Sequence, residues 1–286
     1  MPAVTVQTIQ EMLNEAAENL RVSATAKLDA ELLLAHVLQQ PRTYLYTHQD
    51  VEVASAAATQ FDALVARRAQ GEPVAYITGK RAFWDLELEV TPAVLVPRPE
   101  TELLVEAALD LIAKDSAAYV ADLGTGSGAI AIALANSRPA WNIIAIDSSA
   151  EALAVAKANA YKHNVANLEF RQASWCDDLA PGALDLIVAN PPYVAPGDPH
   201  LQDMSLSFEP LSALQAGQAG YADLFAIATG ARDHLKPGAW LLLEHGYDQH
   251  EELSEKLQAL GYIQVAGRKD LAGHWRMMQA QMPAAD

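Results

Sequence analysis

The tetrapeptide Asn190-Pro191-Pro192-Tyr193 has residue types suited to binding a planar nitrogen group. It follows the apolar run of residues 186–189, which predicts a buried strand. Two prolines fix the backbone and remove two N–H donors, so the remaining polar groups are mainly carbonyl acceptors and the asparagine side chain. A buried substrate –NH2 group has two donors that both need acceptors. The ring of Tyr193 can stack on a planar amide or a base.

These acceptors suggest a chemistry for the tetrapeptide. An amide or aromatic amine nitrogen is a poor nucleophile because its lone pair is delocalised. Acceptors placed off the substrate plane favour a more tetrahedral nitrogen and stabilise the positive charge that builds there during alkylation. We therefore predict that Asn190, Pro191, Pro192 and Tyr193 are both the catalytic and the substrate-binding residues of an N-alkylating enzyme. The alternative is a proline-rich turn in which Asn190 bonds its own backbone.

A glycine loop, Gly124-Thr125-Gly126-Ser127-Gly128, lies between an expected strand and an expected helix. Its glycines allow a sharp turn and close approach to a ligand, and a helix N-terminus favours an anionic group. The glycine spacing differs from the dinucleotide-binding pattern, and no P-loop lysine follows. Asp147 ends the next expected strand, where a carboxylate can accept from both hydroxyls of a ribose. Together they predict an adenosine cofactor site, with a tight turn and a surface aspartate as the alternative.

Three further side chains flank these motifs. Asp122 either caps the glycine loop or contacts the amino acid end of the cofactor. Trp175 follows the third expected strand and can lie against an adenine, although an isolated tryptophan more often serves simple packing. Cys176 beside it is expected to be inert. The sequence has no Ser-His-Asp set, carboxylate pair or metal-ligand cluster that competes as an active site, so we predict no metal.

From about Arg98 onward, apolar runs alternate with helical patterns. The expected strands cover residues 119–123, 142–146, 168–171, 184–189, 240–244 and 262–266. The expected helices cover residues 99–113, 129–137, 150–163, 222–235 and 249–260. Near-continuous apolar strands alternating with helices predict an α/β fold with a parallel sheet covered on both faces. Ligands bind such sheets at the carboxyl ends of the strands, where the tetrapeptide and the glycine loop both fall.

The first part of the chain has a different pattern. Helical periodicity covers residues 9–20, 27–39 and 53–69, and Thr8 with Glu11 forms a capping-box pattern. Residues 85–90 alternate between charged and apolar types as in a half-exposed strand, and residues 93–96 are expected to return as its partner after a turn at Thr91-Pro92. We predict a helical domain over residues 1–80, a β-hairpin linker over 81–97 and an α/β domain over 98–286.

Composition limits the partners. Acidic residues outnumber basic ones 36 to 19 across 286 residues, for a net charge of −17. Because proteins that bind nucleic acid through its phosphates usually present a basic face, this acidic composition makes nucleic acid an unlikely partner. The sequence has no apolar run long enough for a membrane span and no signal-peptide pattern. A single cysteine fits a reducing compartment, so we expect a soluble cytoplasmic protein.

The chain resembles the HemK/PrmC family, the peptide chain release factor N5-glutamine methyltransferases. The resemblance rests on the glycine loop, Asp147, Trp175 and the tetrapeptide, and on three further segments. These are Pro97-Arg98-Pro99-Glu100-Thr101-Glu102, Phe208-Glu209-Pro210-Leu211 and Leu243-Glu244-His245-Gly246. The resemblance implies a class I methyltransferase fold, which is Rossmann-like with a mostly parallel seven-stranded sheet. In the sequence this fold is preceded by a small N-terminal helical bundle and a β-hairpin linker.

The resemblance also implies a reaction and roles for its residues. The cofactor is S-adenosyl-L-methionine and the by-product S-adenosyl-L-homocysteine. Gly124, Thr125, Gly126, Ser127, Gly128, Asp147, Trp175 and Asn190 are implied to bind this cofactor. Asn190, Pro191, Pro192 and Tyr193 are implied to hold the glutamine of the Gly-Gly-Gln motif in class I release factors, whose methylation modulates translation termination. The helical N-terminal domain is implied to dock the release factor.

Other interpretations of the same motifs stay open. An adenine-N6 nucleic-acid methyltransferase shares the tetrapeptide logic but lacks support from the acidic charge, and a ribosomal-protein glutamine methyltransferase is a nearer alternative. A non-catalytic module on the same scaffold has no need of an intact glycine loop. Arg98 and Glu100 either line the substrate entrance or belong to a helix start at Pro99, which is the simpler interpretation. The family's usual charged pair and Arg-Val strand after residue 273 are replaced by His274-Trp275-Arg276-Met277-Met278, which puts details of that strand in doubt.

Overall fold

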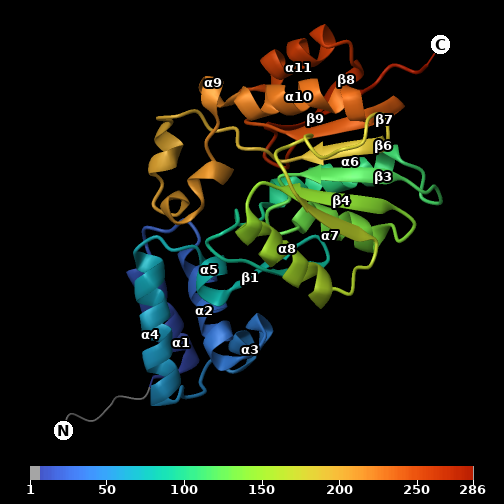
Figure 1. The fold of residues 1–286 in the computed structure, drawn as a ribbon. Helices are drawn as coiled ribbons and strands as arrows, with labels where there is room; N and C mark the ends of the chain where they lie inside the picture. Colours follow the sequence, from blue (N-terminus) through green and yellow to red (C-terminus); the bar gives the residue numbers. More distant parts are fainter. Residues whose placement is uncertain (1–6, 286) are drawn as a thin grey trace. The chain divides into compact units, whose positions relative to one another are not determined.

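The computed structural model of the chain describes residues 7–285 and contains two compact units (Figure 1). One unit comprises residues 7–79 with the short segment Asp203–Phe208. The other comprises Lys80–Gln202 with the chain from Glu209 onward, and it holds every residue of the two predicted sites. Across the described residues, every helix is too short or too polar to cross a bilayer.

The helical unit contains five α-helices in its described residues, which are α1 (Ile9–Asn19), α2 (Ala26–Leu38), α3 (Arg42–Thr47), α4 (Ser55–Ala69) and α5 (Val74–Thr78). The predicted capping box is present, because Thr8 accepts from the Glu11 amide and Glu11 accepts from the Thr8 amide. Leu33, Leu34 and Phe61 lie in the core of this unit. Helices α3 and α5 were not predicted, since five or six residues are too few to show a helical period.

The second unit is built on a seven-stranded sheet with the order β5-β4-β3-β6-β7-β9-β8. Its strands are β3 (Tyr119–Leu123), β4 (Asn142–Asp147), β5 (Leu168–Gln172), β6 (Leu184–Ala189), β7 (Leu235–Glu244), β8 (Ile263–Lys269) and β9 (Trp275–Gln281). Strands β3 to β7 are parallel, whereas β9 runs antiparallel to both β7 and β8. The predicted parallel sheet is confirmed. Strand β9 was absent from the strands expected by apolar pattern, and it forms despite its departure from the family sequence.

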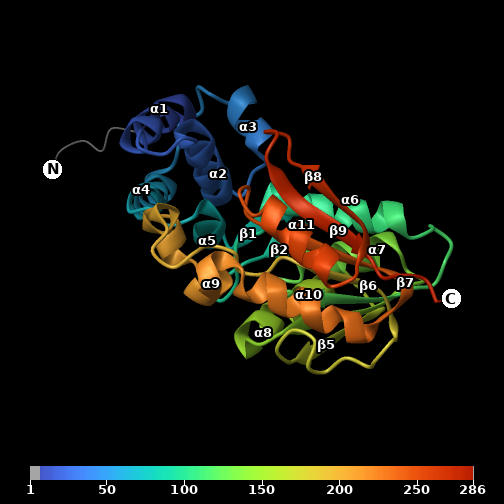
Figure 2. The ribbon, with the colours of Figure 1, turned by 90° about the horizontal axis from the view of Figure 1, so that it is seen from above.

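Helices cover both faces of this sheet. They are α6 (Glu102–Leu111), α7 (Ala129–Ser137), α8 (Ala150–Lys162), α10 (Ala222–His234) and α11 (His250–Ala259). The second unit also contains the short α9 (Gly217–Gly220) and the 3-10 turns η1 (Pro99–Thr101), η2 (Pro199–Gln202) and η4 (Leu211–Ala213), whereas the 3-10 turn η3 (Leu206–Phe208) belongs to the helical unit. Helices α6, α7 and α8 share one apolar core with strand residues such as Val120 and Leu186. The intervening residues Ala121 and Ile187 face the other way, toward α10 and α11, which lie side by side (Figures 1 and 2).

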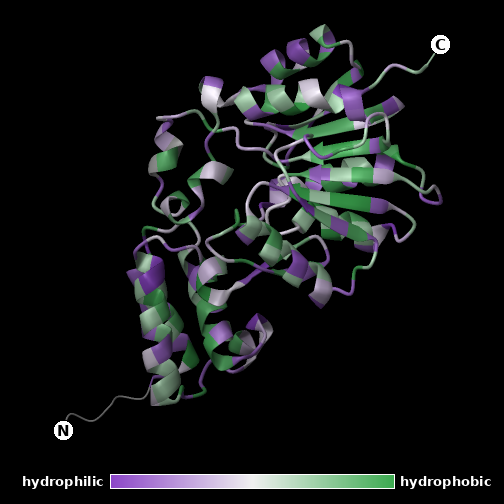
Figure 3. Cartoon of the chain, viewed as in Figure 1, coloured by the Kyte–Doolittle hydropathy of each residue, from purple (hydrophilic) through white to green (hydrophobic). Residues whose placement is uncertain are grey.

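The central strands are apolar along their whole length because both faces are buried. Figure 3 shows hydrophobic residues concentrated in these strands and alternating with polar ones along the helices. Val120, Leu123, Leu186 and Ala189 are fully buried. This is the pattern expected for a parallel sheet covered on both sides.

The β-hairpin differs from the prediction. Its strands are β1 (Lys80–Phe83) and β2 (Leu86–Glu89), which pair antiparallel and turn at Trp84-Asp85. The expected return strand over residues 93–96 is wrong. The Val94 amide bonds the Thr91 carbonyl and the Val96 amide bonds the Glu209 carboxyl, so these donors are not free to form a ladder. Strand β1 gave no signal because Lys80-Arg81-Ala82-Phe83 has no apolar alternation.

One buried side chain, Asn159 of α8, joins the hairpin to the glycine loop. Its Oδ1 accepts from the Glu89 amide at 2.7 Å, while its Nδ2 donates to the Glu89 and Ser127 carbonyls, each at 2.9 Å. The side chain is fully buried. All its polar atoms are therefore paired. If a substitution of the same shape turns the donor into an acceptor, water cannot reach the buried carbonyls to replace the lost hydrogen bonds.

We expect Asn159→Asp to destabilise the protein. Replacing the donor Nδ2 by a carboxylate oxygen leaves the Glu89 and Ser127 carbonyls unpaired and opposes them with a negative charge, at a cost on the order of 2–4 kcal/mol. Urea unfolding measures this cost. The control is Asn164→Asp, the same change at an exposed position with positive φ. Equal unfolding free energies for the two variants would contradict this role of Asn159.

Candidate active site

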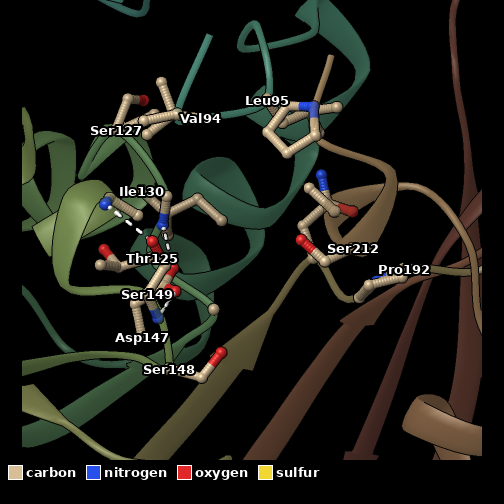
Figure 4. Close-up of a pocket in the computed structure, with 18 of the residues that line it drawn as sticks. Val94, Leu95, Thr125, Ser127, Ile130, Asp147, Ser148, Ser149, Pro192 and Ser212 are labelled. Carbon is tan, nitrogen blue, oxygen red and sulfur yellow. Dashed lines mark hydrogen bonds between the residues drawn. The ribbon is translucent and has the colours of Figure 1, made fainter. Parts of the chain in front are cut away.

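A cavity of about 510 Å³ opens at the carboxyl ends of the central strands, in the second unit. Figure 4 shows Asp147, Ser148 and Ser149 on one side of it, and Pro192 and Ser212 on the opposite side. Predicted residues on its wall are Gly124, Thr125, Gly126, Ser127, Asp147, Trp175, Asn190, Pro192 and Arg98. Gly128, Pro191 and Tyr193 are not among the residues that line it. The structure thus brings the glycine loop and the tetrapeptide to one cavity of the size typical for small ligands.

The glycine loop needs its glycines for different reasons. Gly128 has a φ of +82°, and a Cβ atom there would lie 2.8 Å from Ile132 Cδ1 and 3.2 Å from Ala156 Cβ. Gly126 has a φ of +55°, and the nearest atom to a Cβ there would be the Gly124 carbonyl oxygen, at 4.0 Å. Gly128 therefore allows α7 to pack closely, whereas Gly126 leaves bare backbone facing the cavity.

Asp147 holds this backbone in place. Its Oδ2 accepts from the Gly126 amide and its Oδ1 from the Ser149 amide, both at 2.9 Å. The side chain is half-buried and lines the cavity. Each carboxylate oxygen has a further lone pair, so the group can support the loop and still accept from a ligand hydroxyl.

Trp175 lies against the start of the loop. A Cβ on Gly124 would meet the indole ring at 3.1 Å, so the glycine makes room for the tryptophan. The indole Nε1 donates to Asp223 Oδ1 at 3.2 Å. Burial raises the pKa of the Asp223 carboxyl. Asp223 lines the cavity from the first turn of α10 and was not predicted, because an acidic residue at a helix start is too common to stand out.

Asp122 serves the fold at this point. Its Oδ2 accepts from the Thr125 hydroxyl at 2.6 Å and from the Ala131 amide in the first turn of α7 at 3.2 Å. The side chain is fully buried and does not line the cavity. Of the two roles that the sequence left open, these contacts are those of a cap. Burial raises the pKa of this carboxyl to about 7.

The tetrapeptide is tied to a second buried carboxyl. Asn190 Nδ2 donates to the Thr101 hydroxyl at 3.1 Å, and the Tyr193 hydroxyl donates to Glu244 Oε1 at 3.2 Å. Glu244 ends β7 and is 2% exposed. Burial raises the pKa of the Tyr193 phenol, so this hydroxyl keeps its proton and stays a donor. Sequence reasoning assigned no chemistry to Thr101 or Glu244, which lie 89 and 51 residues from their partners.

Arg98 forms an ion pair with Glu209, and Glu209 also accepts from the Val96 amide at 3.0 Å. Glu209 is buried, while Arg98 is partly exposed and lines the cavity. Pro99 is the first residue of η1, and Arg98 makes no side-chain cap there. Arg98 and the Val96 amide thus share the Glu209 carboxyl, which holds residues 96–98 in place, and Arg98 does not act as a helix cap.

The sheet order with its antiparallel β9 and the loop after β3 define a class I S-adenosylmethionine-dependent methyltransferase. The methyltransferase small domain model matches residues 99–205, and the PrmC N-terminal domain model matches residues 11–79. The chain is 46% identical over 274 residues to the release factor glutamine methyltransferase of Coxiella burnetii, covering 94% of this chain and 98% of the relative. It belongs to the release factor glutamine methyltransferase family.

Two further likenesses agree. The chain is 47% identical over 257 residues to the release factor glutamine methyltransferase of Xylella fastidiosa, which covers 90% of this chain and 94% of the relative. The crystal structure of a methyltransferase from Pyrococcus furiosus matches with a TM-score of 0.54 at 20% identity, over 77% of this chain and 99% of that one. The structural likeness shows the fold alone.

The residues at the cavity suit S-adenosylmethionine. The open backbone at Gly126 admits close approach, and Asp147 offers acceptors for ribose hydroxyls. Trp175 offers an aromatic surface beside the Asp223 carboxylate, an acceptor for an exocyclic amine. The cofactor's size also falls in the range that a cavity of about 510 Å³ accommodates.

We expect Asp122→Asn to gain stability relative to the natural protein as pH rises. The native carboxyl keeps its proton up to about pH 7, while the unfolded chain releases it near its ordinary pKa of about 4. The stability that the neutral carboxyl contributes to the fold is therefore fully present below its pKa in the unfolded chain, and it is lost as pH rises through its pKa in the folded protein. Asparagine mimics the neutral form at every pH.

Urea unfolding between about pH 5.5 and pH 8.5 measures the difference between the two proteins, expected to grow by on the order of 1–3 kcal/mol in favour of the variant. Glu244, whose pKa is also raised to about 7, titrates in both proteins and cancels in the comparison. A difference that does not vary with pH would contradict a buried, neutral Asp122.

Proposed function

We propose that this protein transfers a methyl group from S-adenosylmethionine to the side-chain amide nitrogen (N5) of the glutamine in the Gly-Gly-Gln motif of class I release factors, and so modulates translation termination. The observation that carries the proposal is the placement of Asn190 and Pro192 on the wall of the cavity that also exposes the glycine loop and Asp147. The names of the relatives supply the release factor as substrate.

The chemistry of the tetrapeptide follows from its donors and acceptors. Asn190 Oδ1 and backbone carbonyls of the tetrapeptide accept from the glutamine –NH2 group and orient its nitrogen. Bound S-adenosylmethionine supplies an electrophilic methyl group on a positively charged sulfur. The nitrogen lone pair forms the new N–CH3 bond, the C–S electron pair stays on sulfur, and one amide proton leaves through an acceptor to solvent. The acceptors stabilise the charge on nitrogen before that proton departs.

The roles of the cofactor-side residues are part of the proposal. The glycine loop holds the amino acid end, Asp147 the ribose and Trp175 the adenine, while Asn190 borders both ligands. Tyr193 is proposed to support the substrate site rather than to line it, because its hydroxyl is turned to Glu244.

The proposed partner is a protein rather than a nucleic acid. A net charge of −17 disfavours phosphate binding and suits a basic protein surface. The N-terminal unit, which matches the PrmC N-terminal domain model, is proposed to dock the release factor. A single, buried cysteine supports a reducing compartment, and we place the activity in the cytoplasm.

We expect Asn190→Ala to lower methyl transfer at least about 100-fold, since it removes the side-chain acceptor aimed at the developing charge. The affinity for S-adenosylmethionine, measured by calorimetry, is expected to change less than about tenfold because the glycine loop and Asp147 remain. Mass spectrometry of release factor peptides after incubation gives the readout, a mass increase of one CH2 unit on the Gly-Gly-Gln glutamine.

Two controls accompany this measurement. Asn136→Ala, an exposed change on α7 away from the cavity wall, is expected to keep full activity. A release factor with alanine in place of that glutamine is expected to accept no methyl group. Methylation at another residue, or a preference for a ribosomal protein or DNA over the release factor, would overturn the substrate assignment.

A further inference from the structure

Gln249, the residue before α11, is a glutamine whose side chain joins two of the turns that leave the sheet. It is 3% exposed. Its Oε1 accepts from the Gly246 amide, in the turn after β7, at 2.8 Å. Its Nε2 donates to the Tyr193 carbonyl, at the end of the tetrapeptide, at 3.2 Å. The side chain is therefore held in the turn after β7 and reaches across to the segment that follows β6, the neighbouring strand.

The two partners fix which way the Gln249 amide points. The Gly246 amide is a donor and needs the side-chain oxygen, whereas the Tyr193 carbonyl is an acceptor and needs the –NH2 group. The reverse orientation would place donor against donor and acceptor against acceptor in a buried site, where an unpaired polar group is costly. Position 249 therefore requires a side chain with one acceptor and one donor, and a side chain of the right shape alone does not suffice.

Two further contacts fix the peptide unit that contains the Tyr193 carbonyl. Gly220, ahead of α10, has a φ of +93°, and a Cβ there would overlap the Tyr193 carbonyl oxygen and lie 2.8 Å from Gln249 Nε2. The absence of a side chain at Gly220 thus makes room for this hydrogen bond. On the other side of the same peptide bond, the Val194 amide donates to the Leu214 carbonyl at 3.0 Å. The peptide unit is therefore held at its oxygen by the glutamine and at its nitrogen by the Leu214 carbonyl.

The tetrapeptide depends on contacts of this kind because its two prolines have no N–H group with which to bond a neighbouring strand. At the first residue, Asn190 Nδ2 donates to the Thr101 hydroxyl at 3.1 Å. At the last residue, the Tyr193 hydroxyl donates to Glu244 and the Tyr193 carbonyl accepts from Gln249. The carbonyl acceptors between these two ends are therefore placed by side chains of other elements.

We propose that Gln249 is a positioning residue that holds the Tyr193 carbonyl and thereby places the acceptors of the tetrapeptide where methyl transfer needs them. The inference rests on the proposed function, since these acceptors are the ones assigned to the –NH2 group of the substrate glutamine. A misplacement of about 1 Å can lower a rate about 100-fold. Gln249 is not among the residues that line the cavity, so its effect falls on kcat and not on the affinity for S-adenosylmethionine.

Gln249→Met tests the contact, because methionine has a similar length and forms neither hydrogen bond. We expect kcat at saturating substrates to fall about tenfold to 100-fold. The KM for S-adenosylmethionine is expected to stay within about twofold of that of the natural protein, since the residues that line the cavity are unchanged. The unfolding temperature is measured separately, so that a loss of stability is distinguished from a loss of activity.

Gln249→Glu tests the direction of the hydrogen bond to Tyr193. The introduced carboxylate can still accept from the Gly246 amide, but it sets a second acceptor against the Tyr193 carbonyl. When the carboxyl binds a proton it can donate to that carbonyl again, so low pH restores the natural pattern. Because burial raises the pKa of a carboxyl, this change falls within the pH range of an activity assay. We expect the ratio of kcat in the variant to kcat in the natural protein to rise at least about fivefold from about pH 8.5 to about pH 5.5.

The ratio is the quantity to compare because other groups titrate in both proteins. The segments that meet at Gln249 carry the titratable residues Tyr193, Tyr221, Glu244, His245, Asp248 and His250. These residues are unchanged in the variants, so their effect on kcat cancels in the ratio. The ratio for Gln249→Met, which introduces no ionisable group, is expected to be independent of pH.

Gln281→Glu is the control, matched in hydrogen-bond pattern. The Oε1 atom of Gln281 accepts from Gln264 Nε2 at 2.6 Å, and its Nε2 donates to a backbone carbonyl, that of Gly238, at 2.8 Å. Gln281 ends β9, where it pairs with Trp240 of β7, and it is not among the residues that line the cavity. The same change of hydrogen-bond type there is expected to keep kcat, and the ratio to the natural protein is expected to be independent of pH.

The outcomes separate the two proposals. If the natural protein transfers no methyl group to the release factor glutamine, the proposed function fails and the inference fails with it. If transfer occurs, the positioning inference alone fails when Gln249→Met keeps the natural kcat, or when the ratio for Gln249→Glu changes with pH no more than that for Gln281→Glu. Should Gln249→Glu not fold, kcat of Gln249→Met decides. Failure of both variants to fold would assign the glutamine to folding and overturn its role in positioning.

Discussion

Leu123 of β3 pairs with Ala189 of β6 in a parallel ladder, and both chains leave the sheet directly after this pair. Because parallel strands point the same way, Gly124 and Asn190 emerge side by side although their residue numbers differ by 66. Strand β4 ends at the same edge and adds Asp147. The cofactor-side and substrate-side walls of the cavity thus depend on one register, and a slip by one residue would turn the buried side chains of either strand to the wrong face.

Two buried carboxyls belong to the strands that flank β6, Asp122 in β3 and Glu244 at the end of β7. Burial raises both pKa values to about 7. Their surroundings give them different tasks. Asp122 accepts bonds within the glycine loop and the first turn of α7, and its neutral form fits the fold. Glu244 accepts from the Tyr193 hydroxyl and so holds the last side chain of the tetrapeptide. Similar desolvation therefore acts on a carboxyl that caps the glycine loop in one case and on a carboxyl that holds the tetrapeptide in the other.

Much of the fold follows from local pattern. The apolar runs of β3 and β6 predicted both strands with the bounds that the structure has, because each is buried on both faces and cut off by a turn. The return strand at residues 93–96 was wrong, since alternation alone cannot show that Glu209, distant in sequence, takes the amide of Val96. Likewise the site motifs were visible as short consecutive sequences, whereas Thr101, Asp223 and Glu244 reach the site through tertiary contacts that no local period encodes.

We propose that the methyl group goes to a glutamine side-chain nitrogen of a release factor. Nuclear magnetic resonance of a release factor with ¹⁵N-labelled glutamine side chains tests it directly, before and after incubation with this protein and S-adenosylmethionine. The account predicts that the paired signals of one –NH2 group, that of the Gly-Gly-Gln glutamine, are replaced by a single secondary-amide signal. Unchanged –NH2 signals for every glutamine, with methyl transfer detected elsewhere or not at all, would contradict it.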